Sequence, residues 1–143
     1  MVMLNRRAVL AGMAAVFMKG EAMANPLAEA RVFRFEDAVS GKMANGADRR
    51  VLAQGTLATG ESVRVHESIQ PAGAAMNPLH VIHHSECIVV LEGTLAFVRE
   101  SGEEMAKAGD VIYVAEGTNH TLRNAGAGQA RYVVVGIGGD VKG

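Results

Sequence analysis

The sequence predicts an all-β fold, a sandwich or barrel of short strands, for one domain that takes up most of the chain. Three observations favour this fold class. Short β-prone runs follow one another closely, and Gly-containing turn sequences separate them. No segment keeps a helical period long enough for a bundle or a crossover helix. The 17 Gly residues among 143 also suit a chain with many turns.

The expected strands follow from the order of these runs and turns. The runs are Arg31–Phe35, Arg50–Thr59, Ser62–Gln70, Cys87–Leu91, Thr94–Arg99, Val111–Val114, His120–Asn124 and Ala130–Ile137. A polar loop at residues 40–50 separates the first two. Later breaks include PAGAAMNP at residues 71–78, ESGEE at 100–104, KAGD at 107–110 and NAGAGQ at 124–129. Short strands at this spacing are typical of a sandwich or barrel.

Two of the runs also predict which faces are buried. In Ser62–Gln70, apolar and polar side chains alternate, so the two sets point to opposite faces of a strand. The first set is Val63, Val65 and Ile69, and the second is Arg64, His66 and Ser68. Cys87–Leu91 is continuously apolar, as expected of a strand that is buried on both faces or lies in a barrel wall.

Charge and cysteine content exclude two classes of protein. The formal net charge of -1 gives no electrostatic footprint for nucleic acid, so we expect no nucleic-acid partner. The single cysteine, Cys87, rules out an internal disulfide framework. Because it lies in an apolar run, we expect a buried, inert thiol.

The first 24 residues have the layout of an export signal. Arg6 and Arg7 form a basic start, an apolar run of 11 residues follows at 8–18, and Ala22 and Ala24 frame a small-residue cleavage site before Asn25. The run is too short to span a bilayer about 30 Å thick, so we expect no membrane anchor after cleavage. The sequence NRRAVLA resembles the twin-arginine signal. We therefore expect a periplasmic or otherwise exported domain at residues 25–143, with residues 1–24 removed.

A cluster of potential metal ligands precedes the apolar run at Cys87–Leu91. His80, His83, His84 and Glu86 fall within seven residues. Imidazole and carboxylate groups are ligands of zinc and of the harder first-row metals. Because neighbours on one strand alternate in direction, a site on a β framework needs a second strand. His120 lies in a similar setting near the start of another β-prone run.

The chain resembles the cupin family in two motifs. The second cupin motif, G-x5-P-x-G-x2-H-x3-N, fits Gly109, Gly117, His120 and Asn124, with Ala115 in place of the usual Pro. The first motif, G-x5-H-x-H-x3–4-E-x6-G, fits at His80, Glu86 and Gly93, while Gly73 lies one residue further from His80 than the pattern asks. The resemblance covers residues 61–137 and implies a small β-barrel of the jelly-roll type.

The resemblance implies a metal site with one departure from the family. Cupins commonly bind a divalent metal through three His and one Glu. Here His80, Glu86 and His120 occupy three of these positions, and Ile82 stands where the second His is usual. Two His and one carboxylate form the facial triad of non-heme iron. Alternatively, His84 supplies the missing imidazole. His83 is the weaker candidate, because in an extended segment it faces away from residues 80, 82, 84 and 86.

Two classes of function remain open. One is a metal-dependent enzyme that acts on a small oxygen-rich or carbonyl substrate at the barrel mouth, with oxygenase, isomerase and lyase chemistries unresolved. Glu86 would then be a ligand or a catalytic base, and His66 and Ile82 would line the substrate site. The other is a non-catalytic sensor, carrier or metal-storage protein. Fe, Mn, Zn, Ni and Cu all stay open as the divalent transition metal, and the resemblance implies that a homodimer is common.

Overall fold

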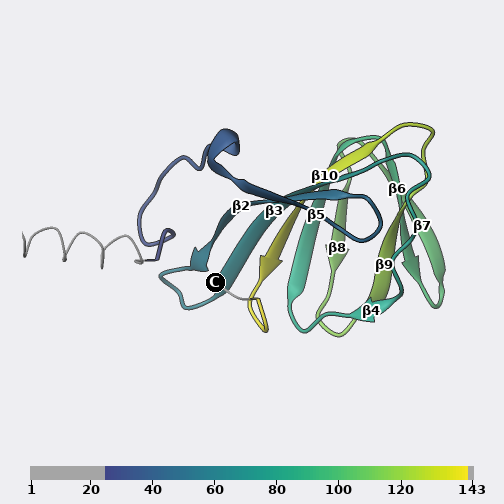
Figure 1. Cartoon of the computed structure of the whole chain (residues 1–143). Helices are drawn as coiled ribbons and strands as arrows, with labels where there is room; N and C mark the ends of the chain where they lie inside the picture. Colours follow the sequence, from purple (N-terminus) through teal and green to yellow (C-terminus); the bar gives the residue numbers. More distant parts are fainter. Residues whose placement is uncertain (1–24, 142–143) are drawn as a thin grey trace, which may run out of the picture.

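The computed structural model describes residues 25–141 as an all-β domain (Figure 1). The predicted export segment, with Arg6, Arg7, Ala22 and Ala24, lies outside the described residues. The elements are η1 (Phe35–Asp37), β1 (Val39–Lys42), β2 (Asp48–Thr56), β3 (Ser62–Gln70), β4 (His80–Val81), β5 (Ser85–Glu92), β6 (Thr94–Arg99), β7 (Gly102–Lys107), β8 (Val111–Val114), β9 (Asn119–Asn124) and β10 (Ala130–Ile137). Among these residues, no helix is long and apolar enough to cross a membrane.

The strands form two sheets, which confirms the predicted all-β jelly-roll fold. The larger sheet has the order β1-β2-β3-β10-β5-β8, and the smaller has the order β4-β9-β6-β7. All strand pairs are antiparallel. The long strands β3 and β10 lie side by side in the middle of the larger sheet, and β9 and β6 lie in the smaller one (Figure 1).

The hydrophobic core draws side chains from both sheets. β10 shows why: its residues alternate between buried and half-buried from Ala130 to Gly136, so Tyr132 and Val134 point inward. Ile88 and Val90 from β5 and Leu95 and Phe97 from β6 join the same cluster. Burying each such aliphatic or aromatic side chain contributes about 1.5–3 kcal/mol.

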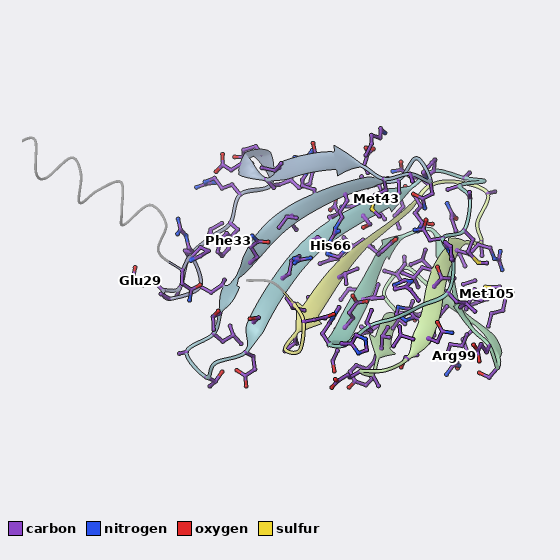
Figure 2. The ribbon with its side chains drawn as sticks, turned by 60° about the horizontal axis from the view of Figure 1, so that its bottom comes forward. Glu29, Phe33, Met43, His66, Arg99 and Met105 are labelled. Carbon is purple, nitrogen blue, oxygen red and sulfur yellow. The ribbon has the colours of Figure 1, made fainter. Side chains whose placement is uncertain are left out.

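The polar face of β3 points into the barrel rather than to solvent. The alternation predicted for Ser62–Gln70 is present, and its polar members His66 and Ser68 line an internal cavity. Figure 2 shows His66 on the larger sheet, away from Arg99 and Met105 at the outer part of the smaller sheet. Apolar side chains, among them Ile88 and Val134, line the same cavity, so its wall is partly polar and partly apolar.

Several segments differ from the sequence prediction. The predicted polar loop at residues 40–50 instead holds most of β1 and the start of β2, which pair with each other, and β4 was not predicted. Arg31–Phe35 forms no strand, and Val32 is 78% exposed, because this β-prone run finds no strand to pair with. The region is held instead by Arg50, whose guanidinium lies 4.1 Å from the centre of the Phe35 ring. Conversely, ESGEE is only partly a turn: β7 begins at Gly102 and pairs with β6.

Candidate functional site in the barrel mouth

The structure brings His80 and His120 together from different parts of the chain. They are direct partners in the β4–β9 pairing. Their ring centres lie 4.9 Å apart with the planes tilted by 42°. His120 is 2% exposed, whereas His80 is exposed at the rim. One imidazole therefore lies inside the barrel wall and the other at its mouth.

Both rings are oriented by a backbone carbonyl two residues earlier. Nδ1 of His80 lies 3.3 Å from the oxygen of Pro78, and Nδ1 of His120 lies 3.1 Å from that of Thr118. Donation from Nδ1 fixes the tautomer and leaves the lone pair on Nε2, the arrangement that commonly orients metal-ligating histidines. Burial lowers the pKa of His120, the hydrogen bond to Thr118 opposes this effect, and the charge of the neighbouring His80 adds to the lowering.

His84 bridges two carboxylates on the other side of the mouth. Its Nε2 lies 2.9 Å from Oε1 of Glu86, and its Nδ1 lies 2.6 Å from Oδ1 of Asp140. Burial alone would lower the pKa of His84. The hydrogen bonds and charges of Glu86 and Asp140 outweigh it, and the pKa is raised. The His84 bond to Asp140 in turn lowers the pKa of that carboxyl group.

Two adjoining cavities, of about 140 and 370 Å³, connect these groups. The smaller reaches inward past His120, and the larger opens toward His84. The side chains common to both walls are Arg49, His66, His80 and Glu86. All the side chains that sequence reasoning singled out as ligands or substrate-lining groups, namely His66, His80, Ile82, His84, Glu86 and His120, line one cavity or both.

Ile82 separates the cavity from the core. It is 6% exposed, belongs to the hydrophobic cluster and also lines the larger cavity. His80, His84 and Glu86 line that cavity too, although the chain bends at residues 83 and 84 between β4 and β5. His83, between Ile82 and His84, is exposed. An apolar wall therefore stands where the family motif usually has an imidazole.

The donor set fits a metal only in part. Among residues 25–141, no three His, Cys, Asp or Glu side chains are gathered closely enough to hold an ion. His80 and His120 both keep the lone pair on Nε2, and Glu86 lines the smaller cavity together with them. Oε1 of Glu86, however, is bound to His84. The third potential ligand, Glu86, is therefore close to the two rings but forms a hydrogen bond to His84.

Sequence reasoning did not assign three charged side chains of the site, Arg49, Arg64 and Asp140. Arg49, on β2, lines both cavities, and Asp140 follows β10 near the end of the described chain. Asp140 meets His84 across 56 residues of sequence. Arg49 faces inward because β2 pairs with β3, placing Arg49 opposite Ser68. Neither Arg49 nor Asp140 had a signal in the sequence, because Arg49 lies in a segment predicted as a polar loop and Asp140 follows the last predicted strand.

His66 is a neutral histidine beside two cations. Burial lowers the pKa of His66 to about 4, with further contributions from the charges of Arg49 and Arg64. Nη2 of Arg49 lies 3.5 Å from Nδ1 of His66 in a long hydrogen bond. Because the guanidinium can only donate, Nδ1 accepts, and the ring proton is on Nε2.

Comparison with known proteins identifies one family. Residues 65–136 match the family described as "Cupin domain". No curated protein matches the chain.

Several solved structures share the fold. An RmlC-like cupin from Shewanella frigidimarina has 16% identity and a TM-score of 0.62, covering 76% of this chain and 91% of that one. The polyketide cyclase RemF from Streptomyces resistomycificus has 17% identity and a TM-score of 0.61, covering 76% and 80%. A sugar phosphate isomerase of the cupin superfamily from Silicibacter pomeroyi has 19% identity and a TM-score of 0.57, covering 75% and 74%. At these identities the likeness is one of fold.

Proposed function

The chain belongs to the cupin domain family, and from that premise we propose that it is an exported, metal-dependent enzyme acting on a small oxygen-rich or carbonyl compound. The observation that carries the proposal is the matched orientation of His80 and His120. Each has its Nδ1 turned to a backbone carbonyl, which leaves Nε2 as the coordinating atom. Two such rings, 4.9 Å apart at a cavity wall, suit a transition-metal ion.

Glu86 completes the proposed donor set. His80, His120 and Glu86 would hold the ion, and Glu86 would exchange its bond with His84 for one with the metal. A divalent transition metal in this position supplies a Lewis acid for a substrate oxygen. While Glu86 is bound to His84, its carboxylate is oriented at the cavity wall, where it can accept a proton from a substrate in the same space.

The surrounding wall supports a small, polar substrate. Tyr132 and Gln70 line the smaller cavity, and Nε2 of Gln70 donates to the Tyr132 hydroxyl at 2.9 Å. Ile82 and Ile88 supply apolar wall. A few polar groups on a partly apolar cavity are typical of small-molecule sites. Fold relatives described as a polyketide cyclase and a sugar phosphate isomerase agree with chemistry on small molecules, without choosing the reaction.

Asn25 supports the proposed boundary of the exported domain. Its side chain donates to the carbonyl of Thr56 at 2.6 Å and accepts from the Thr56 amide at 3.0 Å. Residue 25 is therefore tied to β2 by two hydrogen bonds. Cleavage before Asn25 would keep these bonds, and cleavage after it would remove them.

The function is tested by metal titration followed by a search for turnover. Protein stripped with a chelator should take up one equivalent of a divalent transition metal, measured by elemental analysis. Loaded protein should then convert small carbonyl compounds or consume O₂ with a diphenol substrate. Failure to bind any of Fe, Mn, Zn, Ni or Cu would refute the proposal. Metal uptake without turnover across those substrates would leave a binding module instead of an enzyme.

A further inference from the structure

Arg49 is a half-buried arginine without an acidic partner. Three other arginines face carboxylates: Arg99 with Glu104 at 2.6 Å, Arg123 with Glu103 at 2.8 Å and Arg131 with Glu67 at 3.3 Å. Arg49 has no such ion pair among the residues that the structure describes. Its described side-chain partner is His66, which is neutral. The protein thus directs an unpaired guanidinium at the wall of both cavities.

The charge of Arg49 has no compensating anion in its surroundings within the described chain. Burial lowers the pKa of Arg49, and the charge of Arg64 lowers it further, against a smaller opposing effect of Glu86. Nε of Arg49 is buried and finds no hydrogen-bond partner within residues 25–141. Buried charges in proteins are normally paired, because an unpaired one loses hydration without compensation. A negative ligand near Arg49 would supply that compensation.

His66 adds a neutral donor beside this cation. With Nδ1 accepting from Arg49, the His66 proton is on Nε2, and the ring lines both cavities. One guanidinium and one neutral N–H donor match a carboxylate, in which two oxygens share a single negative charge. The planar donor fork of arginine matches a carboxylate, whereas the greater charge of phosphate usually calls on several cations.

We propose that Arg49 and His66 bind the carboxylate of a small carboxylic acid, whose other end reaches the His80–His120 side of the same cavities. The inference rests on the proposed function, since it names the substrate class of that site. Arg49 and His80 line both cavities, so both side chains face the space that a single small molecule would occupy. The acid is thereby oriented with its carboxylate on β2 and β3 and its oxygen-bearing end toward β4 and β9.

The test uses metal-free protein, so that the two proposals fail separately. Acetate, pyruvate and oxalate are titrated by calorimetry at up to about 10 mM, with pyruvamide as the uncharged analogue and inorganic phosphate as the competing anion. We expect at least one acid to bind and pyruvamide not to bind. Arg49→Met should weaken binding at least about tenfold, since hydrogen bonds to charged groups contribute about 1.5–3 kcal/mol. Arg49→Lys keeps the charge but not the planar donor fork, so its affinity for the acid should lie between those of the wild-type protein and Arg49→Met.

Arg50 offers a matched control. It is the next residue on β2, its Nη1 donates to the carbonyl of Phe35 at 3.1 Å, and it faces the opposite side of the strand. Arg50→Met removes the same charge and should leave acid binding within about twofold. Thermal unfolding of each variant establishes that the barrel is folded.

Each remaining outcome decides between the proposals. Acid binding that needs Arg49 supports the inference even if the protein takes up no metal. Binding that appears only after metal loading, and is equal in Arg49→Met, would refute the inference and leave the metal function standing. Equal binding of pyruvamide, preferential binding of phosphate, or no binding of any acid would also refute it.

Discussion

The side chains of His84 and Glu86 form a hydrogen bond at the barrel mouth, with Nε2 and Oε1 2.9 Å apart. Both side chains are 16% exposed, so the contact is shielded from water. The second ring nitrogen of His84 is bound to Asp140. A ring with both nitrogens donating to carboxylates has no lone pair for a metal. His84 therefore competes with the proposed metal for Glu86.

From this bond we predict that His84→Ala keeps or raises metal affinity, because it frees Glu86 to bind the ion. Ile82→His should raise affinity as well, by adding an imidazole at the position where the family motif has one. It should also lower any activity that needs the open coordination position. Metal titration of the two single variants and the double variant measures both effects. Complete metal loss in His84→Ala would show that His84 is itself a ligand.

His80→Ala and His120→Ala should each weaken metal binding by at least about tenfold, the equivalent of about 1.4 kcal/mol. Each removes one of the two rings whose Nε2 atoms are free to coordinate. His83→Ala is the control, because His83 is the exposed neighbour in the same segment. His120 is buried, so His120→Gln, which keeps a polar side chain, provides a second variant. Wild-type metal content in a folded variant would remove that residue from the site.

Gly93→Ala should destabilise the barrel more than Gly109→Ala. Both glycines have positive φ, 78° and 96°, so both variants carry backbone strain of about 1–2 kcal/mol. At Gly93 an added Cβ would also lie 2.5 Å from the backbone oxygen of Gln129, whereas at Gly109 it meets open space. Urea unfolding of both variants measures the difference. Equal free energies of unfolding would show that the β5–β6 turn accommodates the added Cβ without loss of stability.

Alternation and turn sequences were sufficient to predict four strands to the residue. The bounds of β3, β6, β8 and β10 agree with the predicted runs because each lies between clear turn signals. β7 was missed because it is a polar edge strand in which Ala106 alone is buried. The predicted strand at Arg31–Phe35 was wrong, since a β-prone composition forms a strand only where a neighbour offers hydrogen bonds.

The site was predictable where its residues share a motif. The motif register named His80 and His120, and the structure pairs them directly across β4 and β9. Arg49 and Asp140 belong to neither motif, and their place in the cavity wall depends on strand pairing and on the turn after β10. Such contacts between distant segments leave no local pattern. For the same reason, the engagement of Glu86 by His84 was visible only in three dimensions.

The export proposal predicts a mature N-terminus at or within a few residues of Asn25. Ala22 and Ala24 place small residues at both specificity positions of the cleavage site. Intact-mass measurement of protein from the periplasmic fraction checks the cleavage, and exported protein that still begins with Met1 would contradict it. Replacing Arg6 and Arg7 together by Lys should block export if the twin-arginine route is used. Continued export of that variant would point to another route.

The buried, neutral His66 should make the fold less stable in mild acid. Its pKa is about 4 in the folded protein and about 6.5 when unfolded, so between these values the unfolded chain binds more protons. The stability is fully present above pH 6.5 and is lost as the pH falls toward 4. The loss approaches about 3 kcal/mol for a shift of this size. The charges facing the ring are Arg49 and Arg64, which stay positive throughout this range.

His66→Asn isolates this contribution from the titration of other groups. The Asn side-chain oxygen keeps an acceptor for Nη2 of Arg49 but does not titrate. Urea unfolding at pH 7 and at about pH 4.5 should show a smaller drop in stability for the variant than for the wild-type protein, by about 2–3 kcal/mol. The same drop in both proteins would mean that His66 is protonated in the folded state without penalty, and that water reaches its ring through the cavity.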